Sequence, residues 1–133
     1  MKKHHRATYS SDIRNVALAR RSIAGFAAAC GFSGDDVSDI RLAVGEALSN
    51  AVEHGSGTVA RNIIVECTFE DATLVVMIED SGSTFSEPSV RTSVEPDHRG
   101  RGFGIFLMRR LMDEVTFARN GTIVRLVRHR SLR

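Results

Sequence analysis

The stretch at residues 41–55, RLAVGEALSNAVEHG, has helical periodicity, and one side of it carries polar side chains where an unbroken Ala/Leu/Val surface could have stood. At about 100° per residue, Glu46 and Asn50 lie one turn apart with about 6 Å between their β-carbons, and Glu53 returns close to the direction of Glu46. A carboxylate can serve as a general base, and an amide oxygen can ligate a hard cation such as Mg²⁺. Amphipathic helices usually turn such a side to solvent, but no Lys or Arg stands at i+4 from Glu46 to pair with it.

The segment 99–104, RGRGFG, precedes an apolar stretch that we expect to be a helix beginning near Ile105. Its glycines would let backbone N–H groups approach an anion, and a helix N-terminus adds donors and a positive dipole end. The segment is not a P-loop, because no GK[ST] follows, and not a dinucleotide-binding turn, because no strand directly precedes it. It indicates either a phosphate-binding segment or a flexible loop.

A second acidic residue, Asp80, ends an apolar strand and is followed by Gly82. Aspartates at strand ends often only form turns. In a binding site, Asp80 could accept a hydrogen bond from an exocyclic amine, while Gly82 would allow a flat ring to approach.

Two long helices are expected to position these residues. The first fits residues 11–31, with Ser11 or Asp12 at its start and Gly31 at its end, and the second fits residues 33–55, with acidic residues in its first turn. The side of the second helix opposite Glu46 would pack against the sheet or the first helix; its residues are Ile40, Val44, Leu48 and Ala51.

The strands show a period of two. Residues 62–70 and 73–80 form one expected hairpin around Asp71 and Ala72, and residues 115–129 form another around Asn120 and Gly121. Half-polar alternation predicts helices mainly on one side of the sheet. We therefore expect an α+β fold, a two-layer α/β sandwich with a mixed, mostly antiparallel sheet. The first ten residues, with His4 and His5, are interpreted as a short tail, and residues 81–99 as a long loop.

Composition fits one domain spanning residues 1–133, with 42% hydrophobic residues and a formal net charge of +2. This charge is too small to argue for nucleic acid or a membrane as partner. The basic stretch 125–133 is better explained as a solvated strand end than as a nucleic-acid-binding segment. Cys30 and Cys67 are expected to be free buried thiols, which favours a cytoplasmic location.

Four motifs follow one another in order: Glu-x-x-x-Asn on a helix, Asp-x-Gly after a strand, Gly-x-Gly before a helix, and Asn-Gly-Thr in a hairpin. Together they resemble the GHKL ATP-binding superfamily of gyrase, histidine kinases and MutL-type ATPases. The compact length and the stretch RGRGFGIFLMRRLMDEV are similar to the bacterial anti-sigma factor serine kinases of partner-switching systems. The resemblance covers nearly the whole chain and implies a histidine-kinase-like ATPase fold.

The resemblance implies ATP and Mg²⁺ as ligands and a role for each motif. Glu46 would be the catalytic base that takes the proton of an attacking serine hydroxyl, and Asn50 would ligate Mg²⁺. Asp80 would receive the adenine amine, with Gly82 beside the ring and Thr122 adding a hydroxyl nearby. Residues 83–99 would form a lid over the nucleotide. The phosphate contacts would come from the amides of Gly100, Gly102 and Gly104, with either Arg99 or Arg101 at the terminal phosphate.

The same resemblance implies an anti-sigma regulatory factor that binds a sigma factor and phosphorylates a STAS-type anti-sigma factor antagonist on serine, as a homodimer. Two alternatives stay open. The domain could bind ATP or ADP only to shape a partner-binding surface, without catalysis. It could also be a kinase of the same fold that phosphorylates a scaffold protein and does not bind a sigma factor.

Overall fold

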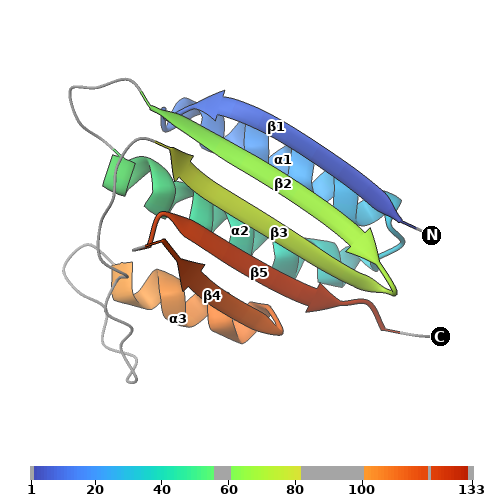
Figure 1. Cartoon of the computed structure of the whole chain (residues 1–133). Helices are drawn as coiled ribbons and strands as arrows, with labels where there is room; N and C mark the ends of the chain where they lie inside the picture. The colour runs from blue at the N-terminus through green and yellow to red at the C-terminus, as the bar shows by residue number, and fades with distance from the viewer. Residues whose placement is uncertain (1, 56–60, 82–100, 120, 132–133) are drawn as a thin grey trace.

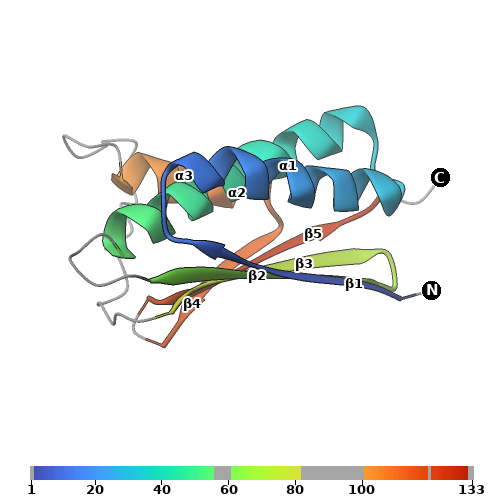
Figure 2. The same cartoon turned by 90° about the horizontal axis from the view of Figure 1, so that it is seen from above.

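The computed structural model describes residues 2–55, 61–81, 101–119 and 121–131. Their elements, in chain order, are β1 (Lys3–Ser10), α1 (Arg14–Ala29), α2 (Gly34–Gly55), β2 (Asn62–Glu70), β3 (Thr73–Ser81), α3 (Arg101–Leu111), β4 (Glu114–Ala118) and β5 (Ile123–His129). The strands form one sheet in the order β1-β2-β3-β5-β4 (Figure 1). The three helices cover one face of it (Figure 2), which confirms the two-layer α+β sandwich. Each neighbouring pair of strands is antiparallel, so the described sheet is antiparallel throughout.

Strand β1 shows that the interpretation of the first ten residues as a tail was wrong. It pairs with β2 over its whole length, from Lys3 opposite Phe69 to Ser10 opposite Asn62. Its alternation was hidden because the half-buried positions carry Lys, His, Ala and Tyr instead of large aliphatic residues. An edge strand can form despite such a weak pattern, because its backbone hydrogen bonds to the neighbouring strand help to keep it in the sheet.

The helix ends follow their local sequence. Helix α1 ends before Gly31, whose φ of 91° is a left-handed conformation that glycine adopts without strain. There the backbone N–H of Phe32 donates to the carbonyl of Ala27, which satisfies a terminal carbonyl. Helix α2 starts after Ser33, whose hydroxyl accepts a hydrogen bond from the N–H of Asp36 at 3.1 Å.

No helix in the described ranges is both long and apolar enough to cross a membrane.

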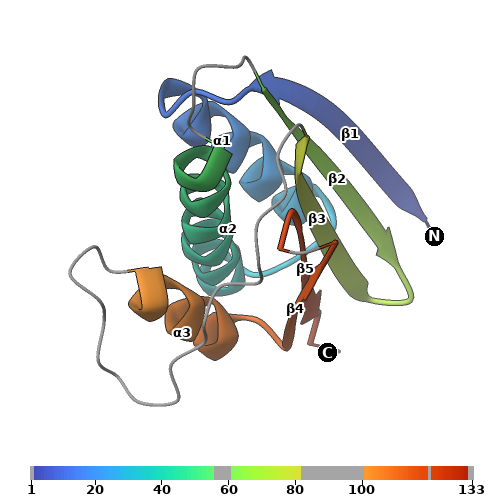
Figure 3. The same ribbon diagram turned by 60° about the vertical axis from the view of Figure 1, so that its left-hand side comes forward.

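The core lies between the helix layer and the inner face of the sheet, and α2 is the central helix, between α1 and α3 (Figure 3). The predicted apolar side of α2 is buried: Ile40, Val44, Leu48 and Ala51 are each at most 9% exposed. Cys30 and Cys67 are also buried and are free thiols, as the sequence predicted. Burial raises the pKa of the Cys67 thiol to about 12, because removing the thiolate from water is costly.

An arginine on β5 connects both layers at one end of the molecule. Arg128 donates to the carboxylate of Asp36 in the first turn of α2 at 2.6 Å, and its second terminal nitrogen donates to the carbonyl of Leu111 at the end of α3. The Arg128 side chain is 17% exposed. This contact fixes the start of α2 and the end of α3 against the same strand, and thus helps to set how the two helices lie relative to each other.

Candidate functional site

The polar side of α2 meets the first turn of α3. A β-carbon added at Gly104 would lie 2.7 Å from the Oε1 atom of Glu46, which is closer than real β-carbons approach other atoms. The Glu46 carboxylate can therefore occupy its present position only if residue 104 is glycine. Glu46 is half-buried, and Asn50, one turn further along α2, is also half-buried, whereas Glu53 is exposed. The Glu46 carboxylate thus lies against the glycine-containing segment, and Glu53 is the most exposed of the three residues.

Helix α3 begins at Arg101, four residues before the predicted start near Ile105. Gly102 and Gly104 are therefore inside the helix and not in a loop that precedes it. A glycine inside a helix costs up to about 1 kcal/mol relative to alanine, but it does not forbid the helical conformation. The close approach of Glu46 gives a physical reason for glycine at position 104.

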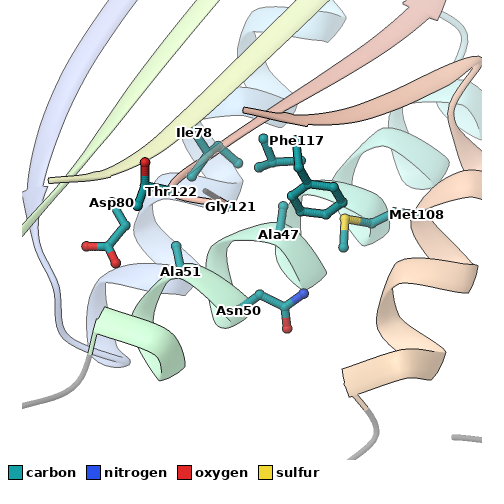
Figure 4. A pocket seen from close by; sticks show the side chains of 10 residues that line it. Ala47, Asn50, Ala51, Ile78, Asp80, Met108, Phe117, Gly121 and Thr122 are labelled. Atoms are coloured by element: carbon teal, nitrogen blue, oxygen red, sulfur yellow. The ribbon is translucent and has the colours of Figure 1, made fainter. Parts of the chain in front are cut away.

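A small cavity lies between α2, α3 and the ends of three strands (Figure 4). Its volume is about 20 Å³, enough for about one water molecule. The predicted site residues Asn50, Asp80 and Thr122 line it, each from a different element. Figure 4 shows Asp80 and Thr122 at one end, Phe117 and Met108 at the other, and Asn50 between them on α2.

The Asp80 end of the cavity is built by backbone hydrogen bonding between β3 and the β4–β5 turn. The N–H of Asp80 donates to the carbonyl of Thr122 at 2.8 Å. Asp80 is 3% exposed and Thr122 is 8% exposed, so both are buried polar residues. The hydroxyl of Thr122 donates to the carbonyl of Arg119 at 2.8 Å, which leaves its lone pairs as acceptors.

The turn that carries Thr122 requires unusual backbone conformations. Arg119 has a φ of 52° and Gly121 a φ of 85°. The glycine adopts this left-handed conformation without steric cost, which agrees with the hairpin predicted from Asn-Gly. The turn then brings the buried Gly121 and Thr122 beside Asp80 at the edge of the cavity.

Several predicted site residues lie outside the described parts of the chain. They are Gly82, Arg99 and Gly100, together with the whole predicted lid, residues 83–99. Arg101 and Gly102 belong to the first turn of α3. The structure therefore brings together Glu46 with Gly104, and Asn50 with Asp80 and Thr122, and the roles of all these residues stay predictions.

Among the apolar residues that line the cavity, the sequence reasoning named only Ala51, and it assigned Ala51 to the packing side of α2. Ala47 and Ala51 on α2 line it, as do Met108 on α3 and Phe117 on β4. The two alanines could have been noticed in the sequence, because small side chains near Asn50 leave space beside it on the helix surface. Phe117 and Met108 had none, since an aromatic or methionine at a core-facing position is ordinary.

The arrangement is suited to a flat, amine-bearing ring joined to an anionic group. A buried carboxylate, small residues and apolar side chains surround one region, and an amide and a second carboxylate lead from it towards the start of α3. Because the cavity is only about 20 Å³, a ring the size of adenine requires side chains at its rim to move. Of the two side chains at one end of the cavity, Phe117 is partly exposed and Met108 is fully buried, so Phe117 is the one that lies at the rim.

The fold and this site define a class. Residues 9–128 match the model of the histidine kinase-like ATPase domain, and the chain belongs to this family. Family membership implies ATP as the ligand. The residues present fit it, since Asp80 offers a buried acceptor for the adenine amine and Gly104 leaves the Glu46 carboxylate close to the start of α3.

Particular relatives are also similar over most of their length. The serine-protein kinase RsbW of Listeria monocytogenes serotype 4b (strain F2365) is 33% identical over 109 residues, which cover 75% of this chain and 69% of the relative. The serine-protein kinase RsbW of Staphylococcus epidermidis is 30% identical over 125 residues, which cover 86% of this chain and 79% of the relative.

Proposed function

We propose that this chain is an ATP-dependent serine-protein kinase that binds a sigma factor and phosphorylates an anti-sigma factor antagonist of the STAS type on serine. The observation that carries the proposal is the position of the Glu46 carboxylate against Gly104 at the start of α3, with Asn50 one turn away lining the same cavity as Asp80. The name of the similar relatives, serine-protein kinase RsbW, supports the serine-kinase part of the proposal.

The residues divide the work between recognition and proton transfer. Asp80 would accept the adenine amine, and the acceptor lone pairs of the Thr122 hydroxyl could reach the same ring through a water. Asn50 would hold Mg²⁺ through its amide oxygen, and Glu46 would take the proton from the serine hydroxyl as the oxygen attacks. Bound Mg-ATP supplies the phosphoryl group and a cation that neutralises its charge. The protein then contributes mainly positioning, so few catalytic side chains are needed.

The remaining contacts in the proposal come from the motifs around these residues. Gly82 would lie beside the adenine ring, the amides of Gly100, Gly102 and Gly104 would face the phosphates, and either Arg99 or Arg101 would reach the terminal phosphate. We also propose that the protein acts as a homodimer.

The proposal is tested by incubating the purified protein with Mg-ATP and its cognate antagonist and measuring phosphoserine. Glu46→Gln should abolish phosphoserine but keep Mg-ATP binding, measured by calorimetry, because the amide cannot accept the serine proton. Asn50→Ala should weaken Mg-ATP binding itself. Glu70→Gln, which changes an exposed carboxylate at the β2–β3 turn, is the control and should change neither.

Two results would contradict the proposal in different ways. Full phosphorylation by Glu46→Gln would remove Glu46 from the role of base. Mg-ATP binding together with capture of a sigma factor, but no phosphoserine from the unmodified protein, would instead identify a non-catalytic nucleotide-binding module.

A further inference from the structure

The outward side of α3 carries an aromatic and basic stripe. Phe103, Phe106, Leu107 and Arg110 follow the spacing i, i+3, i+4, i+7, which places them on one side of a helix. Phe103 is 41% exposed. Its ring stacks on that of Phe106, with 6.1 Å between centroids and 25° between planes, and the guanidinium of Arg110 lies 5.9 Å from the centroid of Phe106. We call these four residues the α3 stripe.

The α3 stripe lies at the margin of the helix layer. Among the helices that the structure describes, α3 packs beside α2, and no other helix covers its opposite side (Figure 3). The inward residues of α3 serve the core, since Ile105 and Met108 are at most 1% exposed. The stripe is thus a second apolar side on a short helix that already buries one.

Arg110 joins the stripe to a polar cavity of about 470 Å³ beyond the end of α3. Other charged residues that line this cavity already have partners: Arg128 pairs with Asp36, and the carboxylate of Asp113 accepts from the backbone N–H of His129 at 2.6 Å. Within the described parts of the chain, Arg110 contacts the Phe106 ring but makes no hydrogen bond or ion pair. Its guanidinium donors are therefore available to a carboxylate from outside.

The charge of α3 selects the chemistry of a partner. Its sequence, RGFGIFLMRRL, contains no acidic residue, and both Arg109 and Arg110 are exposed. A partner that matches this surface presents an apolar side chain to the phenylalanines and an acidic side chain about 10 Å further along the helix, which is the rise from Phe103 to Arg110.

We propose that the α3 stripe and the cavity at Arg110 form the docking surface for the protein whose serine is phosphorylated, through an acidic segment with an apolar anchor. This inference rests on the proposed kinase function. Its link to the site is Gly104, which lies in the same first turn of α3 as Phe103 and faces the Glu46 carboxylate. A protein held along α3 thus contacts the helix whose first turn lies against the residue proposed to take the serine proton.

The test compares the double variant Phe103→Ala/Arg110→Glu with a matched control, Leu42→Ala/Arg41→Glu, which changes an exposed leucine and arginine on α2. The probe is the cognate STAS-type antagonist. We expect the KM for the antagonist to rise at least tenfold in the α3 variant only, with the Kd for Mg-ATP and the affinity for the sigma factor unchanged within twofold. The KM of Arg110→Lys should stay close to that of the unmodified protein, because lysine keeps the positive charge.

Each other outcome overturns the inference. An unchanged KM removes the docking role, and an equal rise in the control shows only a general charge effect. A parallel loss of Mg-ATP affinity assigns the stripe to the nucleotide site, and dissociation of a dimer in gel filtration assigns it to contact between two copies. If the unmodified protein forms no phosphoserine, the proposed function fails separately, and calorimetric binding of the antagonist to both variants still decides whether the α3 stripe docks it.

Discussion

The substitution Gly104→Ala is expected to separate catalysis from stability. The new methyl group would lie 2.7 Å from Oε1 of Glu46, whereas ordinary contacts begin at 3.4 Å, so the carboxylate must move by about 0.7 Å. A misplacement of 1 Å at a reacting group can cost about 100-fold in rate, so we expect the phosphorylation rate to fall by roughly tenfold or more. The Glu46 carboxylate is the free end of a flexible side chain and can move at little cost. Because alanine is the better helix former by up to about 1 kcal/mol, the free energy of unfolding should stay the same or rise.

The assay is single-turnover phosphorylation of the antagonist at saturating Mg-ATP, with urea unfolding of the same samples. Gly25→Ala is the matched control, because Gly25 is also helical and a β-carbon there meets nothing within 4 Å. It should raise stability without changing the rate. In a Glu46→Gln background, Gly104→Ala should have almost no further effect on rate, since both changes act through one carboxylate. A wild-type rate for Gly104→Ala, or a loss equal in both backgrounds, would refute this reasoning.

Three further outcomes follow from the same contacts. Arg128→Met should lower the free energy of unfolding in urea by about 2–4 kcal/mol, because it leaves the carboxylate of Asp36 without its partner, whereas Arg125→Met, at an exposed pair 3.7 Å long, should change it by less than about 1 kcal/mol. Asp80→Asn should weaken Mg-ATP binding about 10–100-fold in calorimetry, because it replaces an acceptor oxygen with a donor in a buried position. Burial raises the pKa of Cys67 from 9.0 to about 12 in the folded protein, so the unfolded chain loses this proton first as pH rises. Stability should therefore fall between about pH 9 and pH 12 by at most about 1.4 kcal/mol per pH unit, and this slope should be shallower in Cys67→Ala.

The sequence predicted the elements wherever the pattern had a local cause. The bounds of α2, β2 and β3 agree closely with expectation, because acidic first-turn residues, a period of two and a two-residue turn each act within a few positions. Strand β1 was not predicted because its half-buried positions carry no large aliphatic residue, and it is recognised only by its pairing with β2. The early start of α3 was not predicted because glycine was taken as a sign of a loop. The reason for glycine at position 104 is the side chain of Glu46, which is far away in the sequence.

Some residues of the candidate site could likewise be predicted from the sequence, and others could not. Asn50, Asp80 and Thr122 could be named from the order of motifs, and the structure places all three on one cavity. Phe117 and Met108 could not, because their contribution depends on where β4 and α3 lie relative to α2, and sequence spacing does not give that. The α3 stripe likewise looked like an ordinary apolar helix until the fold showed which of its sides α2 covers.

The position of β5 has a consequence for how the protein acquires its structure during synthesis. Among the described strands, β5 follows β4 in the sequence, yet it lies between β3 and β4 in the sheet. It also supplies Arg128, which fastens α2 and α3. Before this strand has been synthesised, β1, β2 and β3 can form a three-stranded sheet whose β3 edge is unpaired, and α2 and α3 lack the contact with Arg128 that they share. Glu46 and Gly104 are synthesised earlier, but the Arg128 contact that helps to set how their two helices lie can form only after β5 has been made.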